Sequence, residues 1–213
     1  MALFDQKIQD QLKQVLGQMK ERVNLVFVTQ EFECGSCSDT RQFVEEITGL
    51  SDKLSLTVYD FQKDGDKVKS YGVDKIPAIV LLYADNKDRG IRFYGLPGGY
   101  EINSFMQSIL EVSGHGEELP VGIKDRIGKI KKDIHIQVFV SLGCPYCPQA
   151  VSTAHRLALE NDKITADMVE ASTFPHLANK YNVSGVPKII INETHELTGA
   201  HPVAGFLDEI EKI

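Results

Sequence analysis

The chain of 213 residues is long enough for one large or two small domains, and its 42% apolar and 25% charged residues are ordinary for a globular protein. A formal net charge of −7 without a basic stripe excludes electrostatic attraction to phosphate backbones or anionic lipid, so we expect no nucleic-acid or membrane partner. The N-terminus lacks the continuous apolar segment of a signal peptide, and no apolar run reaches the roughly 18 residues of a membrane span. We therefore expect a cytoplasmic protein, in which paired cysteines usually indicate redox chemistry.

The two halves of the chain repeat one pattern at an offset of 110 residues, measured from Cys34 to Cys144. Several other features recur at the same offset: Asp52-Lys53 and Asp162-Lys163, Tyr71 and Tyr181, Val73 and Val183, and Ile76-Pro77 and Val186-Pro187. A period of about half the chain indicates two copies of one module. A small polar stretch with two glycines, residues 113–118, is typical of a linker, so we predict domains over residues 1–116 and 117–213.

Each half is predicted to contain the same succession of helices and strands. An amphipathic helix opens each half, because apolar residues recur there at helical spacing: Ile8, Leu12, Val15, Leu16 and Met19, and then Ile123, Ile127 and Ile130. The first half continues with strands at 23–28, 54–59, 78–83 and 91–94 and helices at 41–48, 66–71 and 102–112. The second continues with strands at 134–140, 164–169, 188–191 and about 196–198 and helices at 150–159, 175–181 and 203–213. Alternating strands and helices that end in a hairpin predict an α/β fold with a mixed sheet and helices on both faces.

A Cys-x-x-Cys pair stands between the first strand and the next helix of each half: Cys34 and Cys37, and Cys144 and Cys147. Only a thiolate attacks a disulfide, and the unpaired N–H groups and partial positive charge of a helix N-terminus stabilise a thiolate there. We predict that the first cysteine of each pair is the nucleophile and that the second resolves the mixed disulfide. Two alternatives stay open. A zinc site would need a shorter spacing between the pairs, and a structural disulfide that closes so small a loop would remove little unfolded-chain entropy.

A family resemblance rests on these motifs. A strand, a Cys-x-x-Cys at a helix N-terminus and an Ile-Pro or Val-Pro dipeptide some forty residues later resemble the thioredoxin and glutaredoxin superfamily, and Cys-Pro-Tyr-Cys at 144–147 is the glutaredoxin form. Two such modules resemble the glutaredoxin-like protein disulfide oxidoreductases of thermophilic archaea and bacteria. This resemblance covers nearly the whole chain and implies two tandem thioredoxin-like domains, each a central mixed β-sheet flanked by helices. The double module also resembles the N-terminal domain of the alkyl hydroperoxide reductase flavin subunit, whose first copy has lost its cysteines; Cys34 and Cys37 favour the disulfide oxidoreductase.

The resemblance further implies where substrate binds. It implies cis peptide bonds before Pro77 and Pro187, facing the cysteines, so that the backbone of Ile76 or Val186 can pair with an extended substrate segment. The residues alone leave open a trans proline at the start of an edge strand.

Two carboxylates, Asp60 and Glu170, occupy the same position of the repeat, each at the end of a predicted strand. Either could take the proton of the resolving thiol if it lies within hydrogen-bond reach. The alternative is a solvated strand end or a cap for the following helix. Thioredoxins carry a buried acid six residues before the first cysteine, but Val28 and Val138 stand at those positions here.

The residues that precede the two cysteine pairs differ in charge. Glu33 precedes Cys34, whereas the neutral Gly143 precedes Cys144, and a neighbouring negative charge disfavours a thiolate. We predict a lower pKa for Cys144, a more oxidising second pair, and electron flow from the first pair to the second if the two exchange.

These observations predict a protein-disulfide oxidoreductase that reduces, forms or isomerises protein disulfides. The sequence has no phosphate-binding glycine loop or dinucleotide fingerprint and no metal-ligand spacing, so we expect no metal and no cofactor beyond the two redox-active disulfides. Electrons would come from thiols or from a separate flavoprotein that resembles thioredoxin reductase. Two alternatives are a dithiol relay that feeds a peroxidase and a non-enzymatic thioredoxin-fold module that binds partners.

Overall fold

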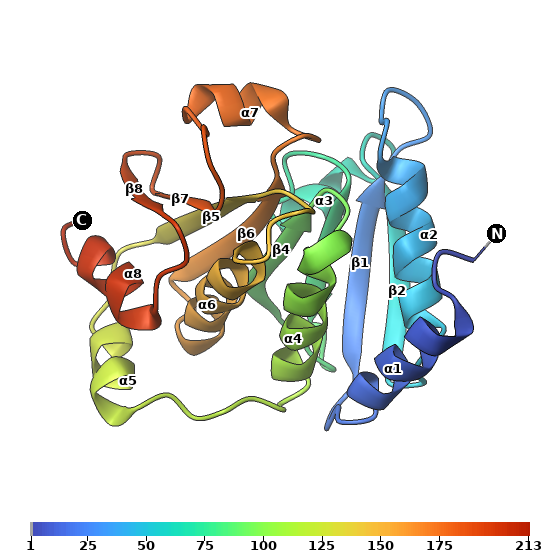
Figure 1. The fold of residues 1–213 in the computed structure, drawn as a ribbon, viewed down its shortest axis with the longest axis horizontal. Helices are drawn as coiled ribbons and strands as arrows, with labels where there is room; N and C mark the ends of the chain where they lie inside the picture. The colour runs from blue at the N-terminus through green and yellow to red at the C-terminus, as the bar shows by residue number, and fades with distance from the viewer. Residues whose placement is uncertain (1) are drawn as a thin grey trace.

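The computed structural model describes residues 2–213 and contains the same succession of elements twice (Figure 1). The first half consists of α1 (Gln6–Leu16), β1 (Val23–Thr29), α2 (Cys37–Thr48), β2 (Leu54–Asp60), α3 (Gly65–Ser70), β3 (Ala78–Leu82), β4 (Asp88–Tyr94), the 3-10 turn η1 (Gly99–Glu101) and α4 (Ile102–Val112). The second half consists of α5 (Val121–Gly128), β5 (Ile134–Val140), α6 (Cys147–Glu160), β6 (Ile164–Glu170), α7 (Pro175–Lys180), β7 (Lys188–Ile191), β8 (His195–Thr198) and α8 (Val203–Ile210). The predicted α/β class and the mixed sheet flanked by helices are confirmed.

The strands of both halves belong to one 8-stranded sheet in the order β2-β1-β3-β4-β6-β5-β7-β8. The two halves join where β4 pairs in parallel with β6, from Ile91 beside Ala166 to Tyr94 beside Val169. Gly90 permits this approach, because its φ is +78° and a Cβ there would lie 2.9 Å from the carbonyl oxygen of Ile164. Backbone hydrogen bonds therefore continue across the junction between the halves.

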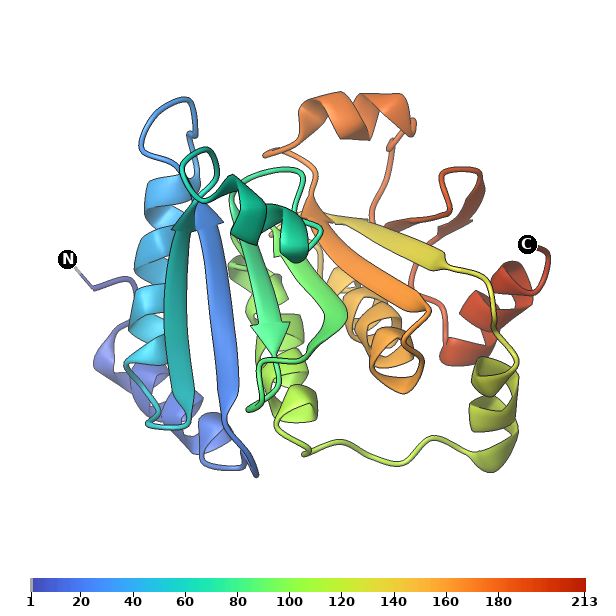
Figure 2. The same ribbon diagram turned by 180° about the vertical axis from the view of Figure 1, so that it is seen from behind.

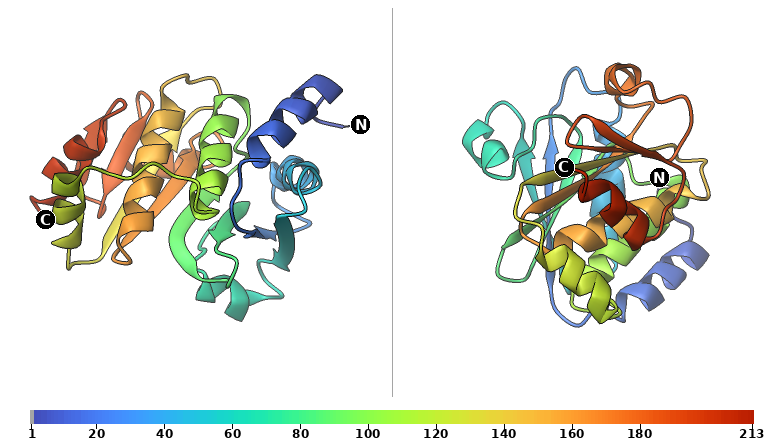
Figure 3. Two further views of the ribbon diagram at one scale, coloured as in Figure 1. Left: turned by 90° about the horizontal axis from the view of Figure 1, so that it is seen from below. Right: turned by 90° about the vertical axis from the view of Figure 1, so that its left-hand side faces the viewer.

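Helices cover both faces of this sheet. α4 and α6 lie side by side on one face, together with α1, α2, α5 and α8, whereas α3 and α7 lie on the other (Figures 2 and 3). On the first face Phe43 and Phe93 each meet Phe105 edge to face, with ring centroids 5.4 and 5.0 Å apart. On the second face Val68 and Phe174 cover the sheet. β4 and β6 are thus buried on both sides, and the junction is part of the core.

The helix that opens each half differs from its prediction. Ile8, predicted on the buried face, is 38% exposed, because α1 packs on the core through Leu12 and Leu16 in its later turns. Met19 and Ile130 are buried as predicted but follow the last residues of α1 and α5, so their burial comes from the loops that leave these helices. The segment between α4 and α5 contains the predicted boundary after residue 116, which stays a prediction. Within residues 2–213 there is no helix of the length and apolarity that crossing a membrane requires.

Candidate active sites

Both cysteine pairs lie on the same edge of the sheet. β4 runs parallel to β1, because β3 is antiparallel to both, and β4, β6 and β5 are parallel in turn. The cysteines follow the carboxyl ends of β1 and β5, and the two X-Pro bonds precede the antiparallel neighbours β3 and β7. We call this edge the active edge. β2, β4 and β6 also end there, so Asp60, Gly95 and Glu170 lie along it.

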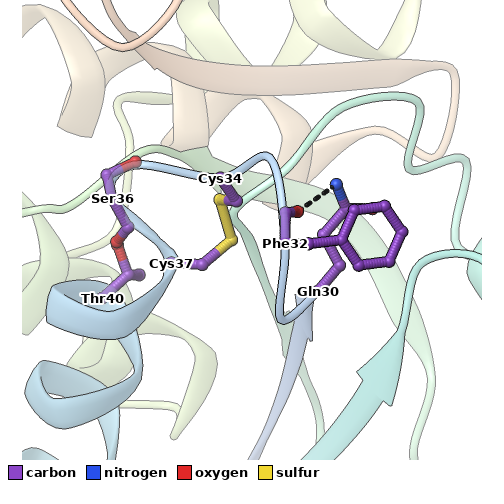
Figure 4. The surroundings of a disulfide bond; sticks show 6 residues. All are labelled: Gln30, Phe32, Cys34, Ser36, Cys37 and Thr40. Carbon is purple, nitrogen blue, oxygen red and sulfur yellow. Dashed lines mark hydrogen bonds between the residues drawn. A yellow bond between two sulfur atoms is a disulfide. The ribbon is translucent and has the colours of Figure 1, made fainter.

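The first site contains the disulfide between Cys34 and Cys37 (Figure 4). Cys37 begins α2 and is buried, whereas Cys34 is partly exposed. The loop before the pair turns sharply: Glu33 adopts a positive φ of 54°, and Nε2 of Gln30 donates to the Phe32 carbonyl at 2.7 Å. The Phe32 side chain is left 55% exposed two residues before the nucleophile. The cysteine predicted to attack is thus the accessible one.

The second site contains the disulfide between Cys144 and Cys147. Cys147 begins α6 and is fully buried, and Cys144 is 8% exposed. Pro148 falls in the first turn of α6, where a missing N–H leaves no hydrogen bond unmade. Tyr146 projects from the loop and is 69% exposed. An aromatic ring is therefore exposed beside each pair.

The peptide bonds Ile76-Pro77 and Val186-Pro187 are both cis. The Val186 carbonyl oxygen lies 3.7 Å from Sγ of Cys144, and Ile76 lines the cleft beside Cys34. The carbonyl oxygen of Pro77 accepts a hydrogen bond from the N–H of Gly95, which follows β4. The carbonyl oxygen of Pro187 accepts one from Gly199, which follows β8. The backbone before each proline is therefore placed beside its cysteine pair, and its predicted contact with substrate stays a prediction.

Asp60 acts as a cap at the end of β2. Its carboxylate accepts hydrogen bonds from the backbone N–H groups of Gln62 and Lys63 at 3.0 and 2.8 Å. The bond from Lys63 is the main reason that the pKa of Asp60 lies below its usual value, which makes this carboxylate a weaker base. This geometry favours the capping alternative for Asp60.

Glu170 caps the turn that follows β6. It accepts hydrogen bonds from the backbone N–H and the hydroxyl of Ser172 at 3.2 and 2.5 Å, and from those of Thr173 at 2.6 and 2.5 Å. Four donors occupy the lone pairs of both oxygens, so this carboxylate also has the geometry of a cap. The proton-acceptor role predicted for either residue stays a prediction that these contacts do not favour.

Glu101 is a buried carboxyl group that the sequence reasoning missed. Its side chain has no exposed surface, Oε2 accepts a 2.5 Å hydrogen bond from Ser104, and Oε1 has no partner. Burial raises its pKa to about 7, although the bond from Ser104 lowers it. The residue belongs to η1, which contacts α6, and the N–H of Tyr100 donates to the Leu142 carbonyl at 3.0 Å. The first half thus places a buried carboxyl group in the turn that contacts α6, the helix that begins at Cys147.

The sequence offered little sign of this buried carboxyl group. A glutamate just before a helix is ordinary, because a negative charge there is favourable to the helix dipole. Its burial follows from the packing of η1 on α6, which comes from the other half of the chain. In the second half Pro202 precedes the corresponding last helix, so the repeat provides no second copy of this carboxyl.

The two sites are far apart along the active edge. β1 and β5 are separated by β3, β4 and β6, which makes four inter-strand steps, or about 19 Å at the usual spacing of roughly 4.8 Å. Thiol–disulfide exchange requires direct attack of one sulfur on another. Electron transfer between the pairs therefore requires a carrier thiol or a second molecule.

Among the described residues, no three or more His, Cys, Asp or Glu side chains form a group that could hold a metal ion. The four cysteines are instead joined within their own pairs. The arrangement corresponds to two dithiol–disulfide centres rather than one centre shared by both pairs.

Known proteins with similar sequences point to the thioredoxin fold and to redox chemistry. A thioredoxin-domain family model matches residues 134–212. One curated relative is the Staphylococcus aureus alkyl hydroperoxide reductase F subunit, which is 28% identical over 190 residues. The matched region covers 89% of this chain and 34% of that protein, so the chain spans about a third of the length of the curated relatives it matches.

Two solved structures are similar over 97% of this chain. The Enterococcus faecalis alkyl hydroperoxide reductase component AhpF has 27% identity and a TM-score of 0.91, with 99% of that chain covered. A protein disulfide oxidoreductase from Aeropyrum pernix has 28% identity and a TM-score of 0.90, with 92% of that chain covered.

Two thioredoxin folds, each with a disulfide at the start of a helix, define a thiol–disulfide redox protein. In sequence and fold the chain is similar to tandem thioredoxin-fold redox proteins, among them a protein disulfide oxidoreductase. Thiol–disulfide exchange at its Cys-x-x-Cys pairs is the chemistry that this fold and these sites support.

Proposed function

We propose that the chain acts on the disulfides of other proteins, through both cysteine pairs, in the cytoplasm. The observation that supports this most directly is the position of both pairs on one open edge of the sheet, each beside the backbone of a cis X-Pro bond. An extended protein segment can pair with that backbone while one of its sulfurs meets the nucleophile.

The reductive reaction consumes two thiols. The thiolate of Cys34 or Cys144 attacks one sulfur of the substrate disulfide, forms a mixed disulfide and releases the other sulfur as a thiolate. The thiolate of Cys37 or Cys147 then attacks the enzyme sulfur, closes the enzyme disulfide and releases the second substrate thiolate. Two electrons pass from the enzyme dithiol to the substrate, and the reverse sequence forms a substrate disulfide.

We assign the proton transfer of the second site to Glu101. Cys147 is fully buried, so its thiol needs a nearby acceptor before it can attack. Glu101 is buried where η1 meets α6, its Oε1 has no partner, and a pKa of about 7 suits both proton uptake and release near neutrality. The first half of the chain would thereby supply a proton-transfer group to the second site.

Electron donors and acceptors are separate proteins in this proposal. A flavoprotein that resembles thioredoxin reductase is the electron donor that we propose for the two disulfides; the 213 residues contain no dinucleotide fingerprint. The second candidate function is a dithiol relay that feeds a peroxidase. The similarity to AhpF of Enterococcus faecalis, over 97% of this chain, favours it.

Reduction of insulin by dithiothreitol tests the activity. The wild-type protein should accelerate it, proteins that retain one cysteine pair should be partly active, and the quadruple Cys→Ser variant should be inactive. Activity that survives the loss of all four cysteines would contradict the proposal and favour a non-enzymatic binding role.

A coupled assay separates the general oxidoreductase from the relay. NADPH, a thioredoxin-reductase-like flavoprotein and this chain should reduce insulin without any peroxidase. NADPH oxidation that requires both a thiol peroxidase and a hydroperoxide would instead favour the relay.

A further inference from the structure

The cleft beside the first site is built by both halves of the chain. It has a volume of about 320 Å³, and its walls come from the loop around Cys34, from Ile76, and from Ser172 and Thr173 of the second half. Thr173 follows β6, which pairs with the last strand of the first half. The second half therefore forms one wall of the first site.

Glu170 holds this wall in place. Glu170 is 4% exposed, and its carboxylate accepts all four hydrogen bonds from the N–H and hydroxyl groups of Ser172 and Thr173. Gly95 packs directly on it: with φ of +95°, a Cβ at Gly95 would lie 2.7 Å from Cβ of Glu170. The turn is thus held between a carboxylate below it and the backbone of the other half beside it.

These hydrogen bonds decide what the wall offers to a substrate. The hydroxyl protons of Ser172 and Thr173 point to Glu170, so their oxygens are left with lone pairs that can only accept. Glu33, which is exposed, also lines the cleft, and a carboxylate likewise only accepts. Among the described residues that line the cleft, none is Lys or Arg.

We propose that the first site selects disulfides in protein segments that carry Lys, Arg or other hydrogen-bond donors beside the cysteine, and that Glu170 is a positioning residue for this selection. This inference rests on the proposed function and names the substrate class of one of its two sites. The second site should not share the preference to the same degree, because Gly143 stands there in place of Glu33.

The repeat supplies a matched control. Asp60 caps the turn after β2 as Glu170 caps the turn after β6, but β2 is the outermost strand of the sheet. A carboxylate cap therefore holds a turn in each half, but only the turn after β6 lines this cleft, whereas the turn after β2 lies at the outermost strand.

The test uses proteins in which one site reacts. In the Cys144→Ser/Cys147→Ser protein, the pre-reduced first site is mixed with either of two synthetic disulfide peptides, one with Lys on both sides of the cysteine and one with Glu on both sides. We expect the lysine peptide to react about fivefold faster at low ionic strength, a preference that high salt should weaken. The Cys34→Ser/Cys37→Ser protein should show a smaller ratio of the two rates.

Variants of the wall sharpen the test. Glu170→Gln should lower the ratio about threefold in the first-site protein, because an amide cannot accept from all four donors. Thr173→Val removes one hydroxyl acceptor and keeps the other three hydrogen bonds to Glu170, so it should also lower the ratio of the two rates. It replaces Glu170→Gln as the test if that variant proves unstable. Asp60→Asn should leave the ratio unchanged. In the second-site protein none of these substitutions should alter it.

Two results would overturn the inference: equal ratios at both sites, or a first-site ratio that neither Glu170→Gln nor Thr173→Val alters. Reaction with uncharged 2-hydroxyethyl disulfide distinguishes this failure from failure of the proposed function. A first-site protein that reduces this reagent but treats both peptides alike refutes the selectivity alone. One that reduces neither the reagent nor the peptides contradicts disulfide exchange at this site, and the selectivity with it.

Discussion

Replacement of Glu101 by glutamine separates the cost of burying this carboxyl from its use in catalysis. In the unfolded chain its pKa is near 4.5, and in the folded protein it is about 7. Between these values the folded state binds a proton at Glu101 that the unfolded state has released, so the contribution of Glu101 to the free energy of unfolding falls as the pH rises from 4.5 to 7 and stays low above 7. The difference of 2.5 units corresponds to about 3 kcal/mol.

Glutamine does not ionise, so Glu101→Gln should lose this pH dependence. Its amide nitrogen would have no partner where Oε1 now stands, at a cost of about 1–3 kcal/mol that does not vary with pH. The measured quantity is therefore the change in free energy of unfolding between pH 4 and pH 9, from urea titrations of the oxidised protein. From pH 4 to pH 9 the free energy of unfolding of the wild type should fall by about 3 kcal/mol more than that of the variant.

The same substitution should slow the second site. In the Cys34→Ser/Cys37→Ser protein, Glu101→Gln should reduce the rate at which Cys147 resolves the mixed disulfide by about 100-fold, and the inflection near pH 7 should disappear. In the Cys144→Ser/Cys147→Ser protein it should have no effect on the first site. Glu117→Gln, on the exposed segment between α4 and α5, is the matched control for both measurements.

Wild-type pH dependence of unfolding in Glu101→Gln would refute the burial argument. An unchanged rate and pH profile at the second site would refute the catalytic assignment, even if the stability result held.

Three further predictions concern other residues. Burial lowers the pKa of His155 to about 4, so its folded form stays neutral while the unfolded chain takes up a proton below pH 6.5. The contribution of His155 to the free energy of unfolding should therefore fall by about 3 kcal/mol from pH 6.5 to 4, opposite in sign to that of Glu101. In urea titrations at these two pH values His155→Gln should lose this contribution relative to wild type, and a pH dependence identical to wild type would count against it. Glu33→Gln should lower the pKa of Cys34 by roughly 0.5 unit, measured as alkylation rate against pH; no change would mean that Glu33 does not set the difference between the two sites. Gly99→Ala should destabilise the protein by about 1–3 kcal/mol, because φ is +56° and a Cβ would overlap the backbone of the neighbouring loop of the second half. Gly122→Ala, with open space around it, is its control, and equal melting temperatures for the two variants would contradict the contact.

The outcomes for individual residues show which properties are encoded locally. The strands at 134–140 and 188–191 and the helix at 102–112 have the predicted bounds, because hydrophobic periodicity reflects a face that any packed arrangement must bury. The position of each cysteine pair at a helix start follows from neighbouring residues in the same way. The first helix shows the limit of this reasoning, since Ile8 has helical spacing but no partner surface.

The sequence by itself determined the repeat, the α/β class and the two cysteine pairs, and it predicted thiol–disulfide exchange as their chemistry. Only the tertiary structure decided how the halves meet, because every edge strand offers the same unpaired backbone groups and the pattern of side chains does not say which edges will pair. The pairing of β4 with β6 places Glu101 of the first half against α6, and Ser172 and Thr173 of the second half beside Cys34. The first site is therefore lined by residues of the second half, and the helix that begins at Cys147 is contacted by a buried carboxyl-bearing turn of the first half.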